Sequence, residues 1–156
     1  MSNPQPTGFR SIPAIWSDAY KHSPKLKPIL KAEGRGELDS LDYGRAHAMI
    51  HCLEAYLTWQ RLKRGDVVLI LSENTMVYYA VDLALQYLGA VNLTVPYDIS
   101  DEDLERLIER HQPHTIFLTS YERYNAFKPI VEGFVDAGGL LLCYTTRHDK
   151  LQFTDK

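Results

Sequence analysis

The chain has 156 residues, which is enough for one domain with a buried core. Hydrophobic residues make up 45% of it and charged residues 24%, a balance that excludes an intrinsically disordered protein. The net charge of −3 provides no basic surface, so the composition argues against a nucleic-acid partner.

The N-terminal segment, residues 1–11, is expected to be a flexible tail. It contains prolines and amides but no apolar run, so it is not a signal peptide. Apolar residues then recur at helical spacing, which predicts a helix over residues 12–22 that Ser23-Pro24 ends. The apolar positions of this helix are Ile12, Ile15, Trp16 and Ala19.

A short hairpin is predicted next. Residues 28–32 and 37–41 are candidate strands, and Glu33-Gly34-Arg35-Gly36 lies between them. Glycine adopts positive φ without steric cost, so this tetrapeptide favours the turn of a hairpin.

The segment after the hairpin predicts a helix and then a buried strand. Asp42 can cap the helix by accepting a hydrogen bond from a free N–H group of the first turn, and we expect the helix to end near Arg61. Residues 67–71 are apolar at every position, which is typical of a strand in a parallel sheet with both faces covered. The apolar stripe of the helix consists of Tyr43, Ala46, Ile50, Leu53 and Leu57.

Residues 76–88 predict a helix with two apolar faces. Because one face must pack on the sheet, we expect the other to meet further protein. That second face, the candidate interface, consists of Tyr79, Leu83 and Tyr87. The face expected to pack on the sheet consists of Val77, Val81, Ala84 and Leu88.

Alternation of strands and helices continues to residue 145. It predicts a single α/β domain over residues 12–145, with an open, mainly parallel sheet between helices on both faces, plus the N-terminal hairpin. Residues 146–156 are polar and predict a frayed tail. The remaining expected elements are a strand at 91–95, a helix from Ser100, a strand at 115–118, a helix at 124–135 interrupted by Pro129 and Gly133, and a strand at 140–145.

Phosphate-binding loops are not expected in this chain. A dinucleotide fingerprint needs glycines directly after a strand, so that backbone amides can approach the phosphates. Ser72-Glu73-Asn74 and Pro96-Tyr97-Asp98 follow the first two strands of the sheet and contain no glycine. A small ligand binder that uses the strand ends in another way stays open as a hypothesis.

Two further sets of side chains could carry chemistry. His47, His51 and Glu54 share one side of a helix and could begin a zinc site, but no fourth ligand is near, so we interpret them as residues at the border of the buried face. Cys52 and Cys143 each lie in an apolar element and are expected to be buried, reduced thiols, as in a cytoplasmic protein. No apolar stretch approaches the about 20 residues that span a bilayer. We therefore predict no membrane span. From the side chains considered above, we also predict no catalytic, cofactor-binding or metal-binding residue.

The order of elements over residues 12–145 resembles the adenylate-forming (AMP-binding) enzymes, and most of all the acyl-CoA synthetases that act on fatty acids. The resemblance is carried by a glycine-aspartate turn, a hydrophobic strand, an asparagine, an apolar helix ending in glycine-alanine, and a strand that leads to a proline. In this chain they are Gly65-Asp66, residues 67–71, Asn74, residues 77–88 with Gly89-Ala90, and residues 91–96.

The resemblance implies a parent enzyme that uses ATP and magnesium to convert a carboxylate to an acyl-adenylate and then to an acyl-CoA. The family binds the ATP phosphates with a glycine-rich loop, but Tyr144-Thr145-Thr146 is followed here by Arg147-His148-Asp149. No catalytic residue of the family maps onto the chain. We therefore expect an N-terminal fragment that is inactive alone and binds none of these cofactors. Its expected partner is the remainder of the enzyme or a second copy. The alternative is a stand-alone protein-interaction module.

Overall fold

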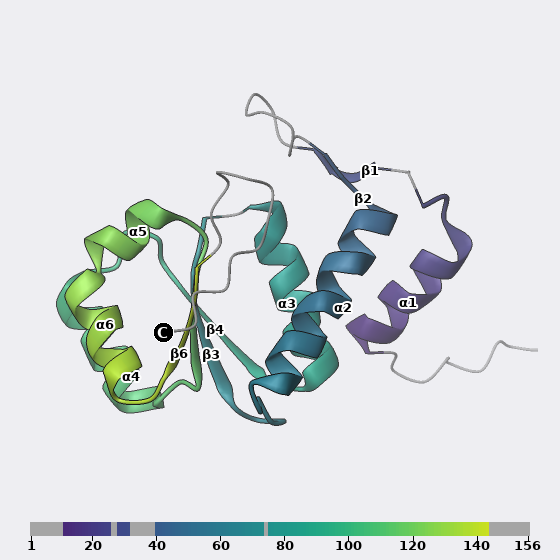
Figure 1. Ribbon diagram of the computed structural model, residues 1–156. Coiled ribbons are helices and arrows are strands. Elements are labelled where there is room, and N and C mark those ends of the chain that lie inside the picture. Colours follow the sequence, from purple (N-terminus) through teal and green to yellow (C-terminus); the bar gives the residue numbers. More distant parts are fainter. Residues whose placement is uncertain (1–10, 26–27, 32–39, 74, 144–156) are drawn as a thin grey trace, which may run out of the picture.

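The computed structural model describes residues 11–25, 28–31, 40–73 and 75–143 (Figure 1). The expected tails, apart from Ser11, lie outside these residues, as do the hairpin turn at residues 33–36, Asn74 and the segment from residue 144 on.

The first elements are a helix and a small antiparallel sheet. Helix α1 spans Ile12–His22, and its N-cap Ser11 accepts a hydrogen bond from the Ala14 N–H at 3.3 Å. Strands β1 (Pro28–Lys31) and β2 (Ser40–Asp42) pair in antiparallel fashion, with Leu30 opposite Leu41. The helix has the predicted bounds. The first predicted strand is present over residues 28–31 and the second over residues 40–41, and the second continues to Asp42. Residues 32 and 37–39 of the predicted strands lie outside the described residues.

Helix α2 spans Tyr43–Trp59 and begins as predicted. The Asp42 carboxylate accepts a hydrogen bond from the Arg45 N–H at 2.7 Å, which satisfies one of the free donors of the first turn. The helix ends two residues before the expected Arg61, because Arg61 has a φ of 66° and this left-handed conformation cannot continue a helix. Four members of the predicted stripe, Ala46, Ile50, Leu53 and Leu57, are buried.

Four parallel strands form the main sheet. They are β3 (Val67–Leu71), β4 (Val91–Val95), β5 (Thr115–Leu118) and β6 (Leu140–Cys143), in the order β4-β3-β5-β6. Val67 lies opposite Val91, and Val68 opposite Thr115. The two central strands are therefore β3 and β5.

Helices cover both faces of this sheet, as the sequence predicts. Helices α2 and α3 (Met76–Leu88) lie on one face, whereas α4 (Asp101–His111), α5 (Tyr121–Ala126) and α6 (Lys128–Asp136) lie on the other (Figure 1). Side chains alternate along a strand, so Val68 and Ile70 join the core under α2 and α3, while Leu69 and Leu71 join the opposite core. The chain therefore forms a three-layer α/β domain with an added hairpin.

The segment predicted as one helix over residues 124–135 is two helices instead. Helix α5 begins three residues earlier, at Tyr121, and Phe127 separates it from α6. Pro129 does not interrupt α6, because it lies in the first turn, where a missing N–H breaks no helical hydrogen bond. Gly133 lies inside α6.

Within the part of the chain that the structure describes, every helix is too short or too polar to cross a bilayer.

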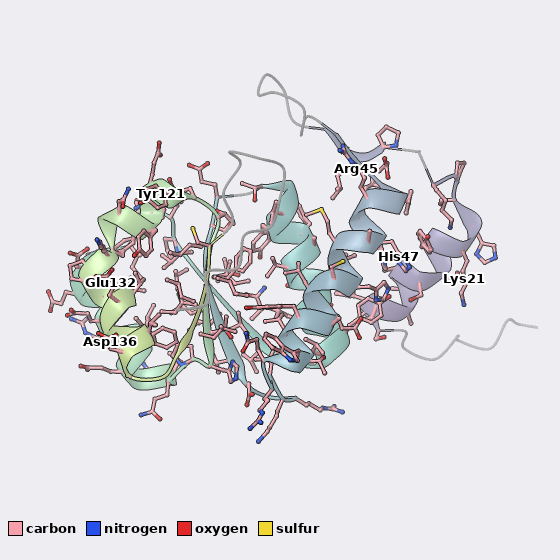
Figure 2. All side chains as sticks on the ribbon, viewed as in Figure 1. Lys21, Arg45, His47, Tyr121, Glu132 and Asp136 are labelled. Carbon is pink, nitrogen blue, oxygen red and sulfur yellow. The ribbon has the colours of Figure 1, made fainter. Side chains whose placement is uncertain are left out.

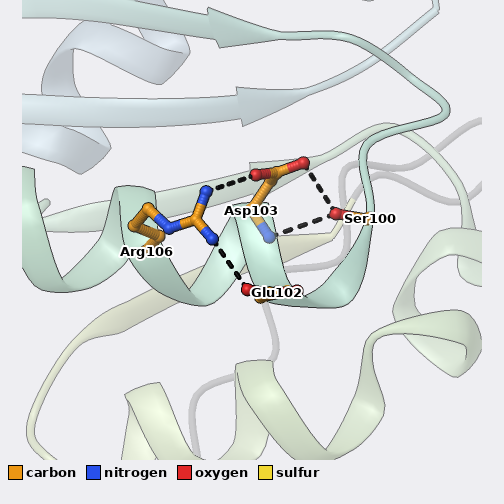
Figure 3. Close-up of polar contacts among 4 residues, drawn as sticks. All are labelled: Ser100, Glu102, Asp103 and Arg106. Atoms are coloured by element: carbon orange, nitrogen blue, oxygen red, sulfur yellow. Dashed lines mark hydrogen bonds and ion pairs between the residues drawn. The ribbon is translucent and has the colours of Figure 1, made fainter.

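The start of α4 joins a cap to a surface ion-pair network (Figure 3). The Ser100 hydroxyl accepts a hydrogen bond from the Asp103 N–H at 3.2 Å and donates one to the Asp103 carboxylate at 2.8 Å. The Arg106 guanidinium lies 2.8 Å from carboxylate oxygens of both Glu102 and Asp103. Acidic residues in a first turn also stabilise the positive end of the helix dipole.

We predict that Ser100→Ala lowers the free energy of unfolding by about 1 kcal/mol, because it leaves a first-turn N–H without its acceptor. Arg106→Ala is the matched control. Its ion pairs are exposed to solvent, so it should cost less than about 0.5 kcal/mol. Urea unfolding followed by circular dichroism measures both. Equal losses for the two variants would contradict this account of the cap.

Candidate functional site

The sheet has one point at which the direction of winding reverses. The chain leaves β3 through α3 and returns to β4 on one side, whereas it leaves β5 through α5 and α6 and returns to β6 on the other side. Ligands of open α/β sheets bind outside the carboxyl ends of the strands at such a reversal. The carboxyl edge of β3 and β5 is therefore the position at which a ligand site is expected.

Two hydroxyl-bearing residues lie at this edge, directly after the central strands. Ser72 follows β3 and Thr119 follows β5, and each is only 8% exposed. The Thr119 N–H donates to the Leu71 carbonyl at 3.3 Å, which extends the ladder by one residue, and the Ser72 hydroxyl donates to the Glu73 carbonyl. The chain itself thus satisfies several polar groups of the edge.

A cation–π contact lies at one end of the same edge. The Arg123 guanidinium carbon lies 3.3 Å from the centre of the Tyr97 ring and 5.7 Å from that of Phe127. This contact joins α5 to the loop after β4. Sequence reasoning did not select Arg123, because residues 26 positions apart in unrelated elements leave no periodic signal.

At two helices of this edge, one first-turn N–H already has an acceptor within the chain. An anion cradle needs unoccupied backbone N–H groups, usually at a helix N-terminus. At α3 the Thr75 hydroxyl accepts from the Tyr78 N–H at 3.2 Å, and at α5 the Ser120 hydroxyl accepts from the Arg123 N–H at 3.2 Å. The exposed Glu73 carboxylate would repel an anion. In the described residues that follow β3, β4 and β5, none of the turns contains glycine.

The histidines of α2 form contacts between helices. The His47 and His51 ring centres lie 4.2 Å apart, and His51 Nδ1 lies 2.7 Å from a Glu54 carboxylate oxygen. His47 stacks on Tyr20 of α1, with ring centres 3.7 Å apart. Burial, and then the nearby His51 and Lys25, lower the pKa of His47 below its ordinary value. Among the described residues, no three metal-ligating side chains are arranged to hold an ion.

The two cysteines differ, and the prediction that both are buried is wrong for Cys52. Cys143 is buried, and burial raises the pKa of its thiol, which keeps it protonated and a poor nucleophile at neutral pH. Cys52 is exposed. It precedes Leu53 in the buried stripe and therefore lies on the solvent side of α2, although its neighbours are apolar.

The candidate interface of α3 is covered in part by α1. Leu83 is half-buried and packs against the core under α2 and α3. The Tyr87 hydroxyl donates to the Pro13 carbonyl at 3.1 Å and lies 2.6 Å from the Ser17 hydroxyl, which donates to it. Tyr79 stays 44% exposed. The second face of α3 thus meets a helix of the same chain, and a contact of Tyr79 with another protein stays a prediction.

A small apolar cavity of about 200 Å³ lies beside Tyr79 and Leu83. Its walls come from α1, the hairpin, α2 and α3, and they include Trp16, Leu41 and Ile50. The Trp16 indole N–H is buried and has no hydrogen-bond partner among the described residues. The cavity marks the place where α1 and the hairpin only incompletely cover α3.

Comparison with solved structures shows the same fold in several ligases. A protein assigned as a long-chain-fatty-acid CoA ligase from Rhodopseudomonas palustris superposes with a TM-score of 0.70 at 18% identity, over 86% of this chain and 32% of that one. A benzoate CoA ligase from Burkholderia xenovorans gives 0.70 at 13% identity, over 86% and 26%. The N-terminal subdomain of NpsA from Klebsiella oxytoca, bound to 3-hydroxybenzoyl-AMSN, gives 0.61 at 21% identity, over 70% and 27%.

The chain thus spans about a quarter to a third of the length of these structures. Comparison with the curated proteins gives no match. The family of AMP-binding enzymes matches residues 16–149, which include the larger part of α1, both sheets and every helix of the three-layer domain. Because that match extends over most of the sequence, the chain belongs to the AMP-binding enzyme family.

Proposed function

We propose that the chain is the N-terminal scaffold of an AMP-forming acyl-CoA synthetase. The observation that carries this proposal is the family match over residues 16–149, combined with a fold that covers only a third or less of each related ligase structure. In this proposal the parent enzyme activates a carboxylate by adenylation and transfers it to CoA. The chain supplies framework rather than reacting groups.

The proposed carboxylate is a fatty acid. The resemblance to fatty-acyl-CoA synthetases supports this choice, together with the fatty-acid ligase among the structural relatives. A relative of equal TM-score is named for an aromatic acid, benzoate. A substrate panel for the parent enzyme must therefore include fatty acids and benzoates side by side.

The proposed partner is the remainder of the enzyme, with self-association of the isolated chain as the other possibility. Tyr79 is the aromatic residue on the second face of α3 that is left 44% exposed, and it borders the apolar cavity. Burial of such a surface by a further subdomain would remove apolar area from water. We place the enzyme in the cytoplasm, where an exposed thiol such as that of Cys52 stays reduced.

We predict that this 156-residue chain gives no heat of binding when it is titrated with ATP and magnesium. The physical reason is the carboxyl edge, where the Thr75 and Ser120 hydroxyls each occupy one first-turn N–H and the Glu73 carboxylate would repel an anion. Isothermal titration calorimetry makes the measurement, and a complete acyl-CoA synthetase titrated in parallel is the positive control. Binding in the micromolar range would overturn the claim that this chain lacks a nucleotide site.

A second measurement tests the proposed activity itself. The gene should be read past the codon of Lys156 and expressed to its natural stop codon. We expect the product to catalyse ATP–pyrophosphate exchange that depends on an added carboxylate, and to do so with fatty acids in preference to benzoates. A stop codon directly after Lys156, or a longer product without exchange activity, would contradict the proposal.

We also predict that Tyr79→Ser weakens self-association of the isolated chain, because it removes an exposed aromatic ring at the edge of the cavity. Sedimentation velocity over a range of micromolar concentrations measures the effect. Trp59→Ser is the matched control, since Trp59 is 68% exposed but lies at the far end of α2. Equal self-association of both variants would exclude this surface. Leu83→Asp is a less specific test, because Leu83 also packs against the core.

A further inference from the structure

Helix α1 is held to the domain by few contacts. None of its residues is fully buried, and Ile12 and Ile15 are 57% and 52% exposed. Trp16 is half-buried and stacks on Tyr43, with ring centres 5.5 Å apart. With no buried apolar residue on α1, its docking depends to an unusual degree on polar and aromatic contacts.

One of these contacts is the pair of hydrogen bonds at Tyr87. The Tyr87 hydroxyl of α3 reaches Pro13 and Ser17 near the start of α1. These bonds join hydroxyl and carbonyl groups, and none of them is an ion pair. They tie α1 to the second apolar face of α3 and so cover Tyr87 itself.

The other contact is a stack of rings near the end of α1. Figure 2 shows His47 on the side of α2 that faces α1. The Tyr20 ring lies on His47 with an angle of 12° between the ring planes, and the Lys25 ammonium lies 3.3 Å from the centre of the same Tyr20 ring. Two groups this close to one ring must occupy opposite faces, so Tyr20 is held between a cation and an imidazole.

We propose that α1 is a pH-sensitive strap, which covers the second apolar face of α3 while His47 is neutral and is released when His47 takes up a proton. A protonated imidazole would be a second cation on the ring of Tyr20, and it would repel the Lys25 ammonium across that ring. It would also stand beside His51, at a ring-centre distance of 4.2 Å. The repulsion between His47 and Lys25 is relieved when α1 leaves with Tyr20 and Lys25, whereas His51 stays beside His47 because both lie on α2.

The charged and titratable groups around His47 come from three elements. Tyr20 and Lys25 belong to α1 and the segment after it, His51 and Glu54 belong to α2, and Tyr87 of α3 faces His51 with ring centres 5.4 Å apart. Glu54 is the one carboxylate in this set, and it is paired with His51 rather than with His47.

The direction of the pH effect follows from the pKa of His47. In the docked state this pKa lies below the ordinary value of 6.5, whereas release of α1 removes burial and Lys25 and returns it toward 6.5. The released state therefore binds the proton more tightly. Docking of α1 is therefore fully favoured above pH 6.5 and weakens as the pH falls below that value. For each pKa unit between the docked and released states, the equilibrium constant for docking falls by up to about tenfold.

Hydrogen exchange of α1 tests the strap directly. The peptide containing residues 12–22 should lose protection between about pH 8 and about pH 5.5 after correction for the intrinsic exchange rate, while peptides from the sheet keep theirs. In a Trp59→Phe background Trp16 is the single tryptophan, and its emission should shift to the red over the same interval. Tyr20→Ala should release α1 throughout the range.

The deciding variant is His47→Phe, which keeps a ring for the stack but cannot be protonated. We expect it to hold α1 in place at both pH values, with His47→Gln as a second non-titrating variant if the larger ring does not fit. His111→Gln is the matched control, because His111 is exposed on α4 on the opposite face of the sheet, and it should behave like the unsubstituted protein. Equal protection of α1 at both pH values in the unsubstituted protein, or the same loss of protection in His47→Phe, would overturn the proposal.

Discussion

The structure depends on the need to cover both faces of a parallel sheet. Every residue of β5 is buried, as are four of the five residues of β3, so neither central strand has a face that tolerates water. Side chains along β3 alternate between two separate cores, one under α2 and α3 and one under α4 and α6. Helices are therefore required on both sides, and the crossovers of a parallel sheet supply them.

This requirement explains why α3 is apolar around so much of its circumference. Its inner face packs on the sheet through residues such as Val77 and Ala84, and α2 packs along its flank through Leu53 and Leu57. The side that remains cannot be left entirely to solvent, and α1 covers it through Trp16 and the hydrogen bonds at Tyr87. Helix α1 does not extend over Tyr79, and the apolar cavity therefore lies beside that residue.

Local signals in the sequence predicted much of the fold. The caps Asp42 and Ser100 and the apolar strands 67–71, 91–95 and 115–118 lie where expected, because each is determined by residues within a few positions of one another. The break at Phe127 was missed, because Pro129 is compatible with the first turn of a helix as well as with a helix end.

The contacts of the candidate site were less predictable, because they join residues that are far apart in the sequence. The stack of Tyr20 on His47 and the contact of Arg123 with Tyr97 join residues that are 26 or 27 positions apart, and they depend on how whole helices dock. No periodicity within a single element records such a pair. The exposure of Cys52 is a different case, since its position on the wheel of α2, beside the stripe rather than in it, carries that information.

The polar groups of the described edge are compatible with membership of the AMP-binding enzyme family. A phosphate cradle requires backbone N–H groups that are free to donate to an anion. Burying such groups against protein without a hydrogen-bond partner costs free energy. Here the hydroxyls of Thr75 and Ser120 already accept from first-turn amides, and Thr119 extends the ladder to Leu71. An edge satisfied in this way can be buried by a neighbouring subdomain without any ligand. That property is consistent with the scaffold role proposed above.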